Sequence, residues 1–157
     1  MISQKARYSI KALLALAAAK PGKPLQTREI AEQGGIPRAF LEQILLEMKR
    51  HRFVESRRGK EGGFILARPP ARITLGDVLR IMDGPIAPLS CLSKNFYRRC
   101  EDCVTEDTCS LRIGLMEAFE AQVDALDRTT LADVLSKTAA ARGDSAWENG
   151  TFIGAYI

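Results

Sequence analysis

Four cysteines lie close together in one stretch of the chain, and their spacing could support metal or redox chemistry. Cys91, Cys100, Cys103 and Cys109 are separated by eight, two and five intervening residues. Thiolates are soft ligands, and four of them complete the coordination of a [2Fe–2S] or [4Fe–4S] cluster or of a tetrahedral zinc ion. A disulfide framework would normally be spread through a secreted chain. The clustering therefore predicts a metal site or a redox-active site.

Basic residues lie among these cysteines and widen the chemistry that they could perform. Lys94, Arg98 and Arg99 favour the thiolate form, which assists both metal ligation and oxidation. The spacing alone leaves three alternatives, namely an iron–sulfur cluster, a zinc ion, and a metal-free thiol–disulfide switch. A thiol oxidoreductase using Cys100 and Cys103 is disfavoured, because that motif normally accompanies a strand–helix–strand unit. Here the cysteines are expected in a loop between helices.

Charge is divided unevenly along the 157 residues, whose net charge is +4. Residues 1–72 hold 15 Lys and Arg against six Asp and Glu, a balance of +9, and residues 73–157 have a balance of −5. A basic half joined to an acidic half indicates that only the first half meets a polyanion such as DNA. No apolar run is long enough to span a membrane and the start lacks a signal-peptide pattern, so we expect a cytoplasmic protein without a membrane partner.

The periodicity of apolar residues predicts the elements that would position these groups. Helices are expected over residues 3–19, 28–33 and 38–50, with Thr27 as the cap of the second. Two short strands, 53–56 and 63–66, flank a basic, glycine-rich turn. Thr74 and Thr130 cap two later helices, and a long helix is expected over residues 111–127 between them. The order predicts a mainly α fold with a small β-hairpin wing, that is, a winged helix-turn-helix domain followed by a long helix.

The third helix and the hairpin would form a surface that reads DNA. Arg38 can donate to guanine, Gln43 can pair with adenine, and Glu42 can accept from the amino group of cytosine. Basic residues at the hairpin tip suit phosphates or a narrow minor groove. The candidate DNA-binding residues are Arg28, Arg38, Glu42, Gln43, Lys49, Arg57, Arg58 and Lys60.

Several runs of the chain resemble the Rrf2 family of bacterial regulators, which includes IscR-, NsrR- and RirA-like members. The runs are Arg7-Tyr8, Ala12-Leu13-Leu14, Glu29-Ile30-Ala31-Glu32, Ile36-Pro37-Arg38, Leu41-Glu42-Gln43, Arg58-Gly59-Lys60-Glu61-Gly62-Gly63-Phe64, Ala67-Arg68-Pro69 and Ile73-Thr74-Leu75-Gly76-Asp77-Val78. The resemblance covers about residues 1–140. It implies a homodimer formed through the long helix, with a sensor loop before it. It also implies that Glu42 helps to choose between DNA sites according to cluster occupancy, and that Arg58 enters the minor groove.

The resemblance also implies a ligand set, from which this chain departs. Cluster-binding members carry three cysteines in the loop, which Cys91, Cys103 and Cys109 match. The IscR-like members have a histidine three positions after the last cysteine, where this chain has Arg112, a residue that does not ligate metals. NsrR-like members recruit an acidic side chain near the first helix of the partner subunit, and Tyr8 occupies the corresponding region of this chain. The only histidine, His51, is expected on the surface. Cys100 is therefore the candidate fourth ligand.

We interpret the chain as a homodimeric transcriptional repressor, not an enzyme, that binds a double-stranded DNA operator under the control of an iron–sulfur cluster. The cluster would sense iron, nitric oxide or redox state. Residues 1–83 would form the DNA-binding domain, 84–110 the sensor loop, 111–140 the dimerisation helix and a short terminal helix, and 141–157 a flexible tail. A zinc-stabilised scaffold that binds protein is a further alternative, and it leaves the basic hairpin unexplained.

Overall fold

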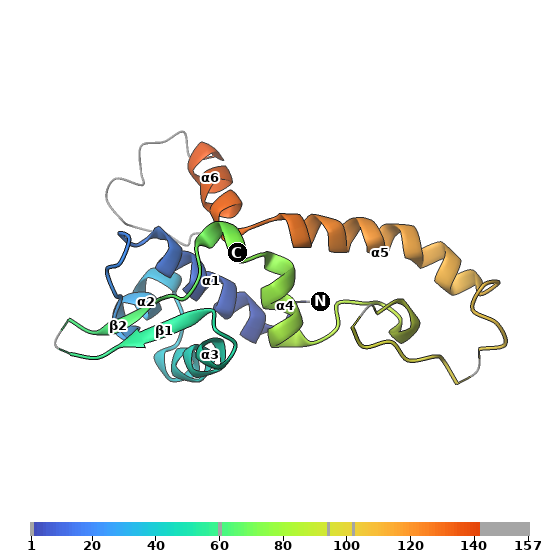
Figure 1. The fold of residues 1–157 in the computed structure, drawn as a ribbon, viewed down its shortest axis with the longest axis horizontal. Coiled ribbons are helices and arrows are strands. Elements are labelled where there is room, and N and C mark those ends of the chain that lie inside the picture. Colours follow the sequence, from blue (N-terminus) through green and yellow to red (C-terminus); the bar gives the residue numbers. More distant parts are fainter. Residues whose placement is uncertain (1, 60, 94, 102, 142–157) are drawn as a thin grey trace.

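A computed structural model describes residues 2–59, 61–93, 95–101 and 103–141 of the chain (Figure 1). The helices are α1 (Gln4–Ala18), α2 (Thr27–Gly34), α3 (Arg38–Arg50), α4 (Leu75–Asp83), α5 (Ser110–Arg128) and α6 (Leu131–Ala141). The strands β1 (Val54–Arg57) and β2 (Gly63–Leu66) form an antiparallel hairpin, and η1 (Pro70–Arg72) and η2 (Ser90–Leu92) are short 3-10 turns. The predicted mainly α fold with a hairpin wing is confirmed.

Helix α1 lies at the centre of the hydrophobic core and touches α2, α3, α4 and α6. Its Ala12, Leu13 and Ala15 are fully buried, and the two alanines let neighbouring helices approach closely. Helix α3 packs on α1 through its own buried stripe, which includes Leu41 and Leu45. Burial of each leucine stabilises the fold by roughly 1.5–3 kcal/mol. The core therefore fixes which face of α3 is left exposed.

Helix α2 begins one residue earlier than predicted, because Thr27 lies within the helix and does not cap it. The cap position is Gln26, which has an extended backbone. Its backbone N–H donates to the Glu29 carboxylate at 2.6 Å. Leu25 is paired with β2, and the chain leaves its extended conformation after Gln26. The prediction of a Thr27 cap is thus wrong because a tertiary contact sets the start of α2.

The caps predicted for the two later helices are confirmed. The backbone N–H of Asp77 donates to the Thr74 hydroxyl at 3.0 Å, and the N–H of Thr74 donates to the Asp77 carboxylate at 3.4 Å. At the start of α6, the N–H of Asp133 donates to the Thr130 hydroxyl at 3.1 Å. Such caps satisfy backbone donors that a helix leaves unpaired at its N-terminus.

The hairpin is attached to the rest of the domain by a third extended segment. Leu25 and Phe64 exchange two backbone hydrogen bonds of 2.9 and 2.8 Å. This close approach requires glycine at position 63, because a Cβ there would lie 2.3 Å from the Leu25 carbonyl oxygen. The first strand starts at Val54, one residue later than predicted. Phe53 still donates its N–H to the carbonyl of Met48 in α3 at 2.9 Å, so the ladder begins after it.

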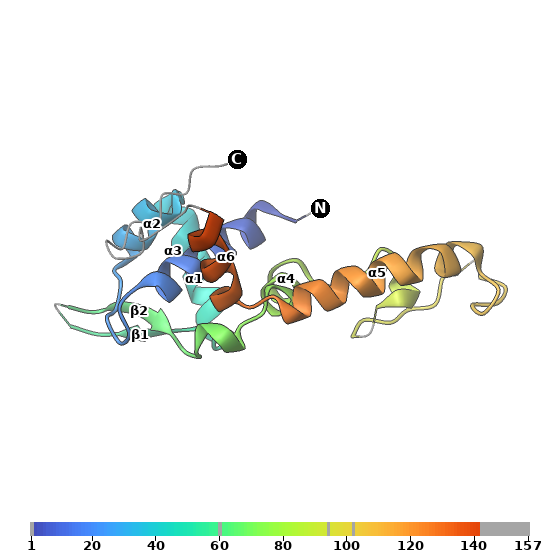
Figure 2. The same cartoon turned by 90° about the horizontal axis from the view of Figure 1, so that it is seen from above.

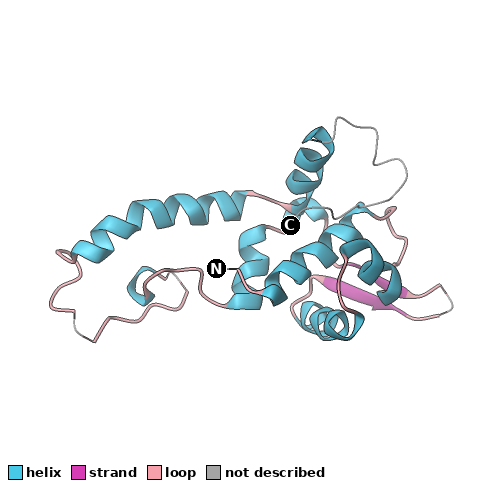
Figure 3. Ribbon diagram, turned by 180° about the vertical axis from the view of Figure 1, so that it is seen from behind, coloured by secondary structure: helices cyan, strands magenta, loops and turns pink. Residues whose placement is uncertain are grey.

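Helix α5 projects away from the winged-helix body and meets it at its C-terminal end (Figures 1 and 2). At this junction Leu75 donates to the carbonyl of Thr129 at 2.9 Å, and Leu131 donates to the carbonyl of Ile73 at 3.0 Å. Viewed from behind, the loop that carries the cysteines runs back beneath α5 (Figure 3). The first bond joins the end of α5 to the start of α4, and the second joins the start of α6 to the segment that leads into α4.

The helices of the described residues include none long and apolar enough to cross a membrane. The predicted tail lies almost entirely in residues 142–157, which fall outside the described residues. Lys60 and Lys94, named above for the hairpin tip and the cysteine loop, fall outside them as well.

Candidate DNA-binding surface and cysteine loop

The exposed face of α3 carries the polar residues that the sequence assigned to DNA bases. Because Leu41, Ile44, Leu45 and Met48 are buried, Arg38, Glu42, Gln43 and Lys49 are left exposed. Arg38 Nε lies 3.6 Å from Glu42 Oε1, an ion pair across one turn of the helix. Gln43 is exposed on the same helix. The structure thus brings three candidate base-contacting residues to the first two turns of α3.

Two other predicted DNA-binding residues are held by local partners. Arg28 Nε donates to Glu32 Oε1 at 2.8 Å, and this hydrogen bond, with the charge of Glu32, raises the pKa of Arg28. Lys49 Nζ donates to the Ser56 hydroxyl at 2.6 Å and so connects α3 to β1. Both cations remain exposed to solvent, which leaves their charge accessible to a polyanion.

The hairpin tip places two predicted arginines at the edge of the domain. Arg57 and Arg58 are exposed. Arg57 Nη1 donates to the carbonyl of Gly22 at 3.4 Å, which ties the turn end of β1 to the loop after α1. A Cβ at position 62 would lie 2.4 Å from the Arg57 carbonyl oxygen, so glycine permits the tight turn. The wing therefore presents positive charge on a short, firmly attached hairpin.

All four cysteines line one cavity of about 290 Å³ at the start of α5. Cys91 is buried on η2, and the other three are partly buried. All four are thiols. Within the described ranges, no three Cys, His, Asp or Glu side chains converge closely enough to hold a metal ion. The fold therefore gathers the four predicted ligands around a single space without placing their sulfur atoms in coordination geometry.

Arg112 lies inside this cysteine loop, at the position where the resemblance places a histidine. Its Nη1 donates to the carbonyl oxygen of Cys91 at 2.6 Å and lies 3.1 Å from Glu106 Oε2. Hydrogen bonding with the Cys91 side chain, followed by the charge of Glu106, raises the pKa of Arg112. The other oxygen of Glu106 accepts a hydrogen bond from the Tyr97 hydroxyl. Arg112 therefore fixes Cys91 to α5 through a hydrogen-bonded network.

Two arginines among the cysteines, Arg98 and Arg99, take part in hydrogen bonds with the backbone or side chains of the loop. Arg99 Nη2 donates to the carbonyl oxygens of Cys103 and Val104 at 3.0 and 3.1 Å. The Ser90 hydroxyl donates to the carbonyl of Arg98 at 2.7 Å. These bonds fold the segment between η2 and α5 onto itself. Arg99 was expected to favour thiolates, and its hydrogen bonds place it beside the cysteine backbone.

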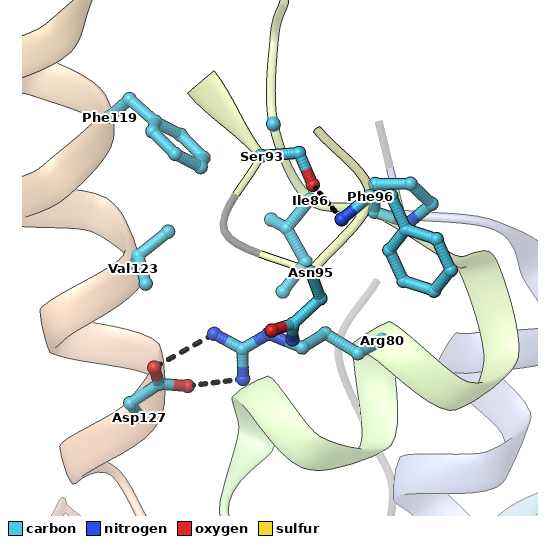
Figure 4. Close-up of a pocket in the computed structure, with 10 residues that line it drawn as sticks. Arg80, Ile86, Ser93, Asn95, Phe96, Phe119, Val123 and Asp127 are labelled. Carbon is cyan, nitrogen blue, oxygen red and sulfur yellow. Dashed lines mark hydrogen bonds and ion pairs between the residues drawn. The ribbon is translucent and has the colours of Figure 1, made fainter. Parts of the chain in front are cut away.

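A second cavity, of about 270 Å³, lies where α4, α5 and the loop after α4 meet (Figure 4). Arg80 reaches from α4 to Asp127 on α5 with two hydrogen bonds of 2.6 and 2.8 Å. Phe119 and Val123 of α5 form the apolar wall beside this ion pair. The Asp127 hydrogen bond raises the pKa of Arg80. The ion pair adds side-chain contacts to the backbone bond between α4 and α5.

Sequence reasoning missed Glu106, Arg80 and Asp127, and it treated Arg112 only as a lost ligand. Arg80 and Asp127 are 47 residues apart, and no local pattern connects them. Glu106 carried a weak signal, since a carboxylate in a loop with several cations is well placed to pair with one of them. His51 is exposed at the end of α3, which confirms the expectation of a surface residue.

The fold and these sites define a winged-helix transcriptional regulator. The chain belongs to the Rrf2 family, because the family model described as an iron-dependent transcriptional regulator matches residues 2–137. A regulator from Rhodobacter capsulatus named as Rrf2-like is 42% identical over 139 residues, which cover 87% of this chain and 93% of that protein. The confirmed family agrees with the resemblance drawn from the sequence.

Two solved structures share the fold over most of their length. The structure of CymR, the global cysteine regulator of B. subtilis, matches with a TM-score of 0.73 and 30% identity, covering 87% of this chain and 97% of that chain. The structure of IscR from T. potens matches with a TM-score of 0.72 and 26% identity, covering 95% and 96% respectively. The fold of this chain is therefore about equally similar to the solved structures of two regulators, CymR and IscR.

Proposed function

We propose that this Rrf2-family regulator is a homodimeric DNA-binding repressor whose operator affinity is controlled by an iron–sulfur cluster. Its ligands would be Cys91, Cys100, Cys103 and Cys109. The observation that carries the proposal is the single cavity that all four cysteines line. The description of the family as iron-dependent favours iron over zinc. Iron supply, nitric oxide and redox state are the candidate signals, because each would alter cluster occupancy.

The residues of the cavity fit a cluster in donor number and donor softness. Four thiolates satisfy a [2Fe–2S] or [4Fe–4S] centre. Glu106 also lines the cavity, but both of its oxygens are engaged, one by Tyr97 and one by Arg112. Cys100 is therefore the fourth ligand that we propose. When bound, the cluster supplies an iron-dependent and oxidation-sensitive link among the four cysteines.

We propose that α3 enters the major groove and that the wing lies over the neighbouring minor groove. Arg38 and Gln43 would contact base edges, and Glu42 would either accept from a cytosine or hold Arg38 through its ion pair. This competition gives Glu42 a physical means of selecting between DNA sites. Arg57 and Arg58 would meet phosphates or the minor groove.

The other basic residues that we predict to bind DNA would add affinity that does not depend on the DNA sequence. Arg28 and Lys49 are exposed and would contact the phosphate backbone. Lys60 belongs to the same proposed wing by its place in the sequence. Each phosphate contact releases counterions, so affinity should fall steeply as the salt concentration rises.

A continuous set of contacts connects the cysteine cavity to α3. Arg112 joins Cys91 to the start of α5. The far end of α5 is held to α4 by the backbone bond from Leu75 to Thr129 and by the pair of Arg80 with Asp127. Helix α4 packs on α1, and α1 packs on α3. Ordering of the cysteine loop would therefore bias the position of α5 and, through it, the presentation of α3.

The exposed apolar residues of α5 support a second copy of the chain as its partner. Leu111 is 66% exposed and Ile113 is 57% exposed, while Leu115 and Met116 are 38% and 39% exposed. A projecting helix with such residues needs another apolar face to cover them. Replacing Leu111 by Glu should convert dimers to monomers in sedimentation experiments, whereas Glu117→Gln on the same helix should not.

The decisive experiment is purification without oxygen, followed by visible absorption and assays of iron, acid-labile sulfide and zinc. We expect a coloured protein with equal iron and sulfide. Removal of the cluster should change operator affinity by roughly 10-fold or more. Thr105→Ala is the matched control, because Thr105 lines the cavity without being a ligand. The proposal fails if replacing all four cysteines leaves DNA affinity unchanged under every iron and redox condition.

A metal-free thiol–disulfide switch is the second candidate function. The backbone N–H of Cys103 donates to the carbonyl of Cys100 at 3.3 Å, which holds the two residues close together in the same cavity. The likeness to the structure of a cysteine regulator supports this alternative. A colourless protein whose DNA affinity responds to oxidant, and in which Cys100→Ser abolishes the response, would select this mechanism over the cluster. A zinc-only protein that binds no duplex DNA would instead favour the scaffold alternative.

A further inference from the structure

A third cavity, of about 330 Å³, lies between the loop after α1 and the end of the hairpin. Three cations line it, namely Lys20 and Lys23 from the loop and Arg68 from the segment after β2. None of the described residues that line it is an aspartate or a glutamate. The cavity is therefore a concentration of positive charge with no counter-charge in its own wall.

Arg68 is the residue that sets this cavity apart from an ordinary basic surface. Its Cζ lies 4.7 Å from the centroid of the Phe53 ring, and Phe53 is fully buried. Its Nε is buried and has no hydrogen-bond partner among the described residues. Stacking on an aromatic ring stabilises a cation but leaves its N–H groups unsatisfied. A partly buried guanidinium in this state favours an anion that accepts its hydrogen bonds.

The two lysines extend the same site toward solvent. Lys20 follows the C-terminus of α1, where a cation is also favoured by the helix dipole, so Lys20 alone would not indicate a ligand. The dipole of α1 does not explain the presence of Lys23, which lies further along the loop, or of Arg68, which follows β2. Pairing of Leu25 with Phe64 holds the loop against the hairpin, so the three cations are brought together by the fold.

We infer that this cavity binds a phosphate group, with Arg68 as the buried donor and Lys20 and Lys23 at the mouth. Arginine and lysine are the residues that recognise phosphate through charge and multiple hydrogen bonds. The phosphate comes either from the DNA backbone beside the wing or from a free phosphate compound. The first source rests on the proposed DNA-binding function, and the second does not.

Two measurements on the intact protein separate these sources. The first is thermal unfolding in inorganic phosphate against chloride at matched ionic strength. The second is the salt dependence of binding to a short random-sequence duplex. The variants are Arg68→Gln and the double variant Lys20→Gln/Lys23→Gln. Because both lysines are exposed, replacing them should not perturb folding. The controls are Arg72→Gln and Arg72→Gln/Lys137→Gln, which remove the same charge from exposed positions outside the cavity.

A free phosphate compound is supported if phosphate raises the unfolding temperature of the wild type and controls by roughly 2–4 °C but does not raise that of the cavity variants. The DNA backbone is supported if the slope of log affinity against log salt falls by about 0.9 in Arg68→Gln but not in Arg72→Gln. The inference is overturned if neither measurement separates cavity variants from controls. If the wild type binds no duplex DNA, the proposed function fails while the unfolding experiment still decides the cavity.

Discussion

Arg80 on α4 and Asp127 on α5 form a two-bond ion pair across the junction between the winged-helix body and the projecting helix. The two hydrogen bonds measure 2.6 and 2.8 Å. Gly76 lies directly beneath the pair, since a Cβ at that position would approach Asp127 Oδ1 to 2.0 Å. The junction is therefore packed around the ion pair, and a shift of α5 relative to α4 must disturb it.

Asp127→Asn should weaken this junction. The ion pair is lost, but because Asp127 is 41% exposed the free energy of unfolding should fall by only about 0.5–1 kcal/mol. The larger effect is expected on the proposed coupling between cluster and DNA, seen as a smaller difference in DNA affinity between protein with and without the proposed cluster. Urea denaturation and DNA-binding titrations measure the two quantities. Equal effects from Asp124→Asn, an exposed change on the same helix, would contradict the prediction.

Gly76→Ala should not stabilise the protein even though alanine is the better helix former. Alanine is favoured over glycine by about 1 kcal/mol in an open helix. Here the new Cβ would displace Asp127 Oδ1 and Arg80 Nη1, which lie 2.0 and 2.9 Å away. Displacing the ion pair costs about 0.5–1 kcal/mol, which offsets the gain in helix propensity, so we expect little net change in the free energy of unfolding. In an Asp127→Ala background the main clash is absent, so the same substitution should stabilise the protein by up to about 1 kcal/mol, as a double-mutant cycle would show.

Arg112→Ala should release Cys91 from α5 and shorten the lifetime of a bound cluster. Arg112 is a positioning residue, because its Nη1 holds the Cys91 carbonyl at 2.6 Å. The expected result is faster loss of visible absorption in air with little change in helix content. Glu117→Ala, exposed on the same helix, is the control. An unchanged decay rate in Arg112→Ala would show that the network does not support the cysteine loop.

Gln43→Ala should reduce sequence discrimination and leave non-specific binding intact. A lost bidentate base contact costs about 1–3 kcal/mol at the contacted base pair, which is roughly a 5- to 150-fold change in specific affinity. Competition between operator and random duplex DNA measures the ratio. Arg57→Gln should behave differently, since it removes a proposed phosphate contact and weakens binding to both duplexes alike. Equal losses on both duplexes for Gln43→Ala would place it outside base recognition.

The Asp133 carboxyl group at the start of α6 should titrate at low pH. A hydrogen bond from the Thr130 hydroxyl, followed by one from its backbone N–H, lowers the pKa of Asp133 below its ordinary value of 3.8. The ionised carboxylate therefore adds stability that is complete above that ordinary value and is lost as the pH falls through the lowered pKa of the folded state. Carboxyl NMR titration should show this pKa moving up in Thr130→Ala. No movement would contradict the assigned cause.

Much of the fold could be predicted because its signals are local. The apolar stripe of α3, the Thr74–Asp77 capping box and the glycine-rich hairpin turn each depend on residues within a few positions of one another. The Thr27 cap was wrong for the opposite reason, since the pairing of Leu25 with Phe64 moved the start of α2. The four cysteines could be named as one site because they are close in sequence.

The sequence by itself determined the fold class, the family and the set of residues available for chemistry, because periodicity, charge partition and motif spacing are properties of neighbours along the chain. Only the tertiary structure decided that Arg112 fixes Cys91 to α5, that Arg80 pairs with Asp127, and that Arg68 stacks on Phe53 beside two lysines. These contacts join segments that packing brings together. Hydrogen bonds and ion pairs depend on distance in space, and spacing along the chain does not specify that distance.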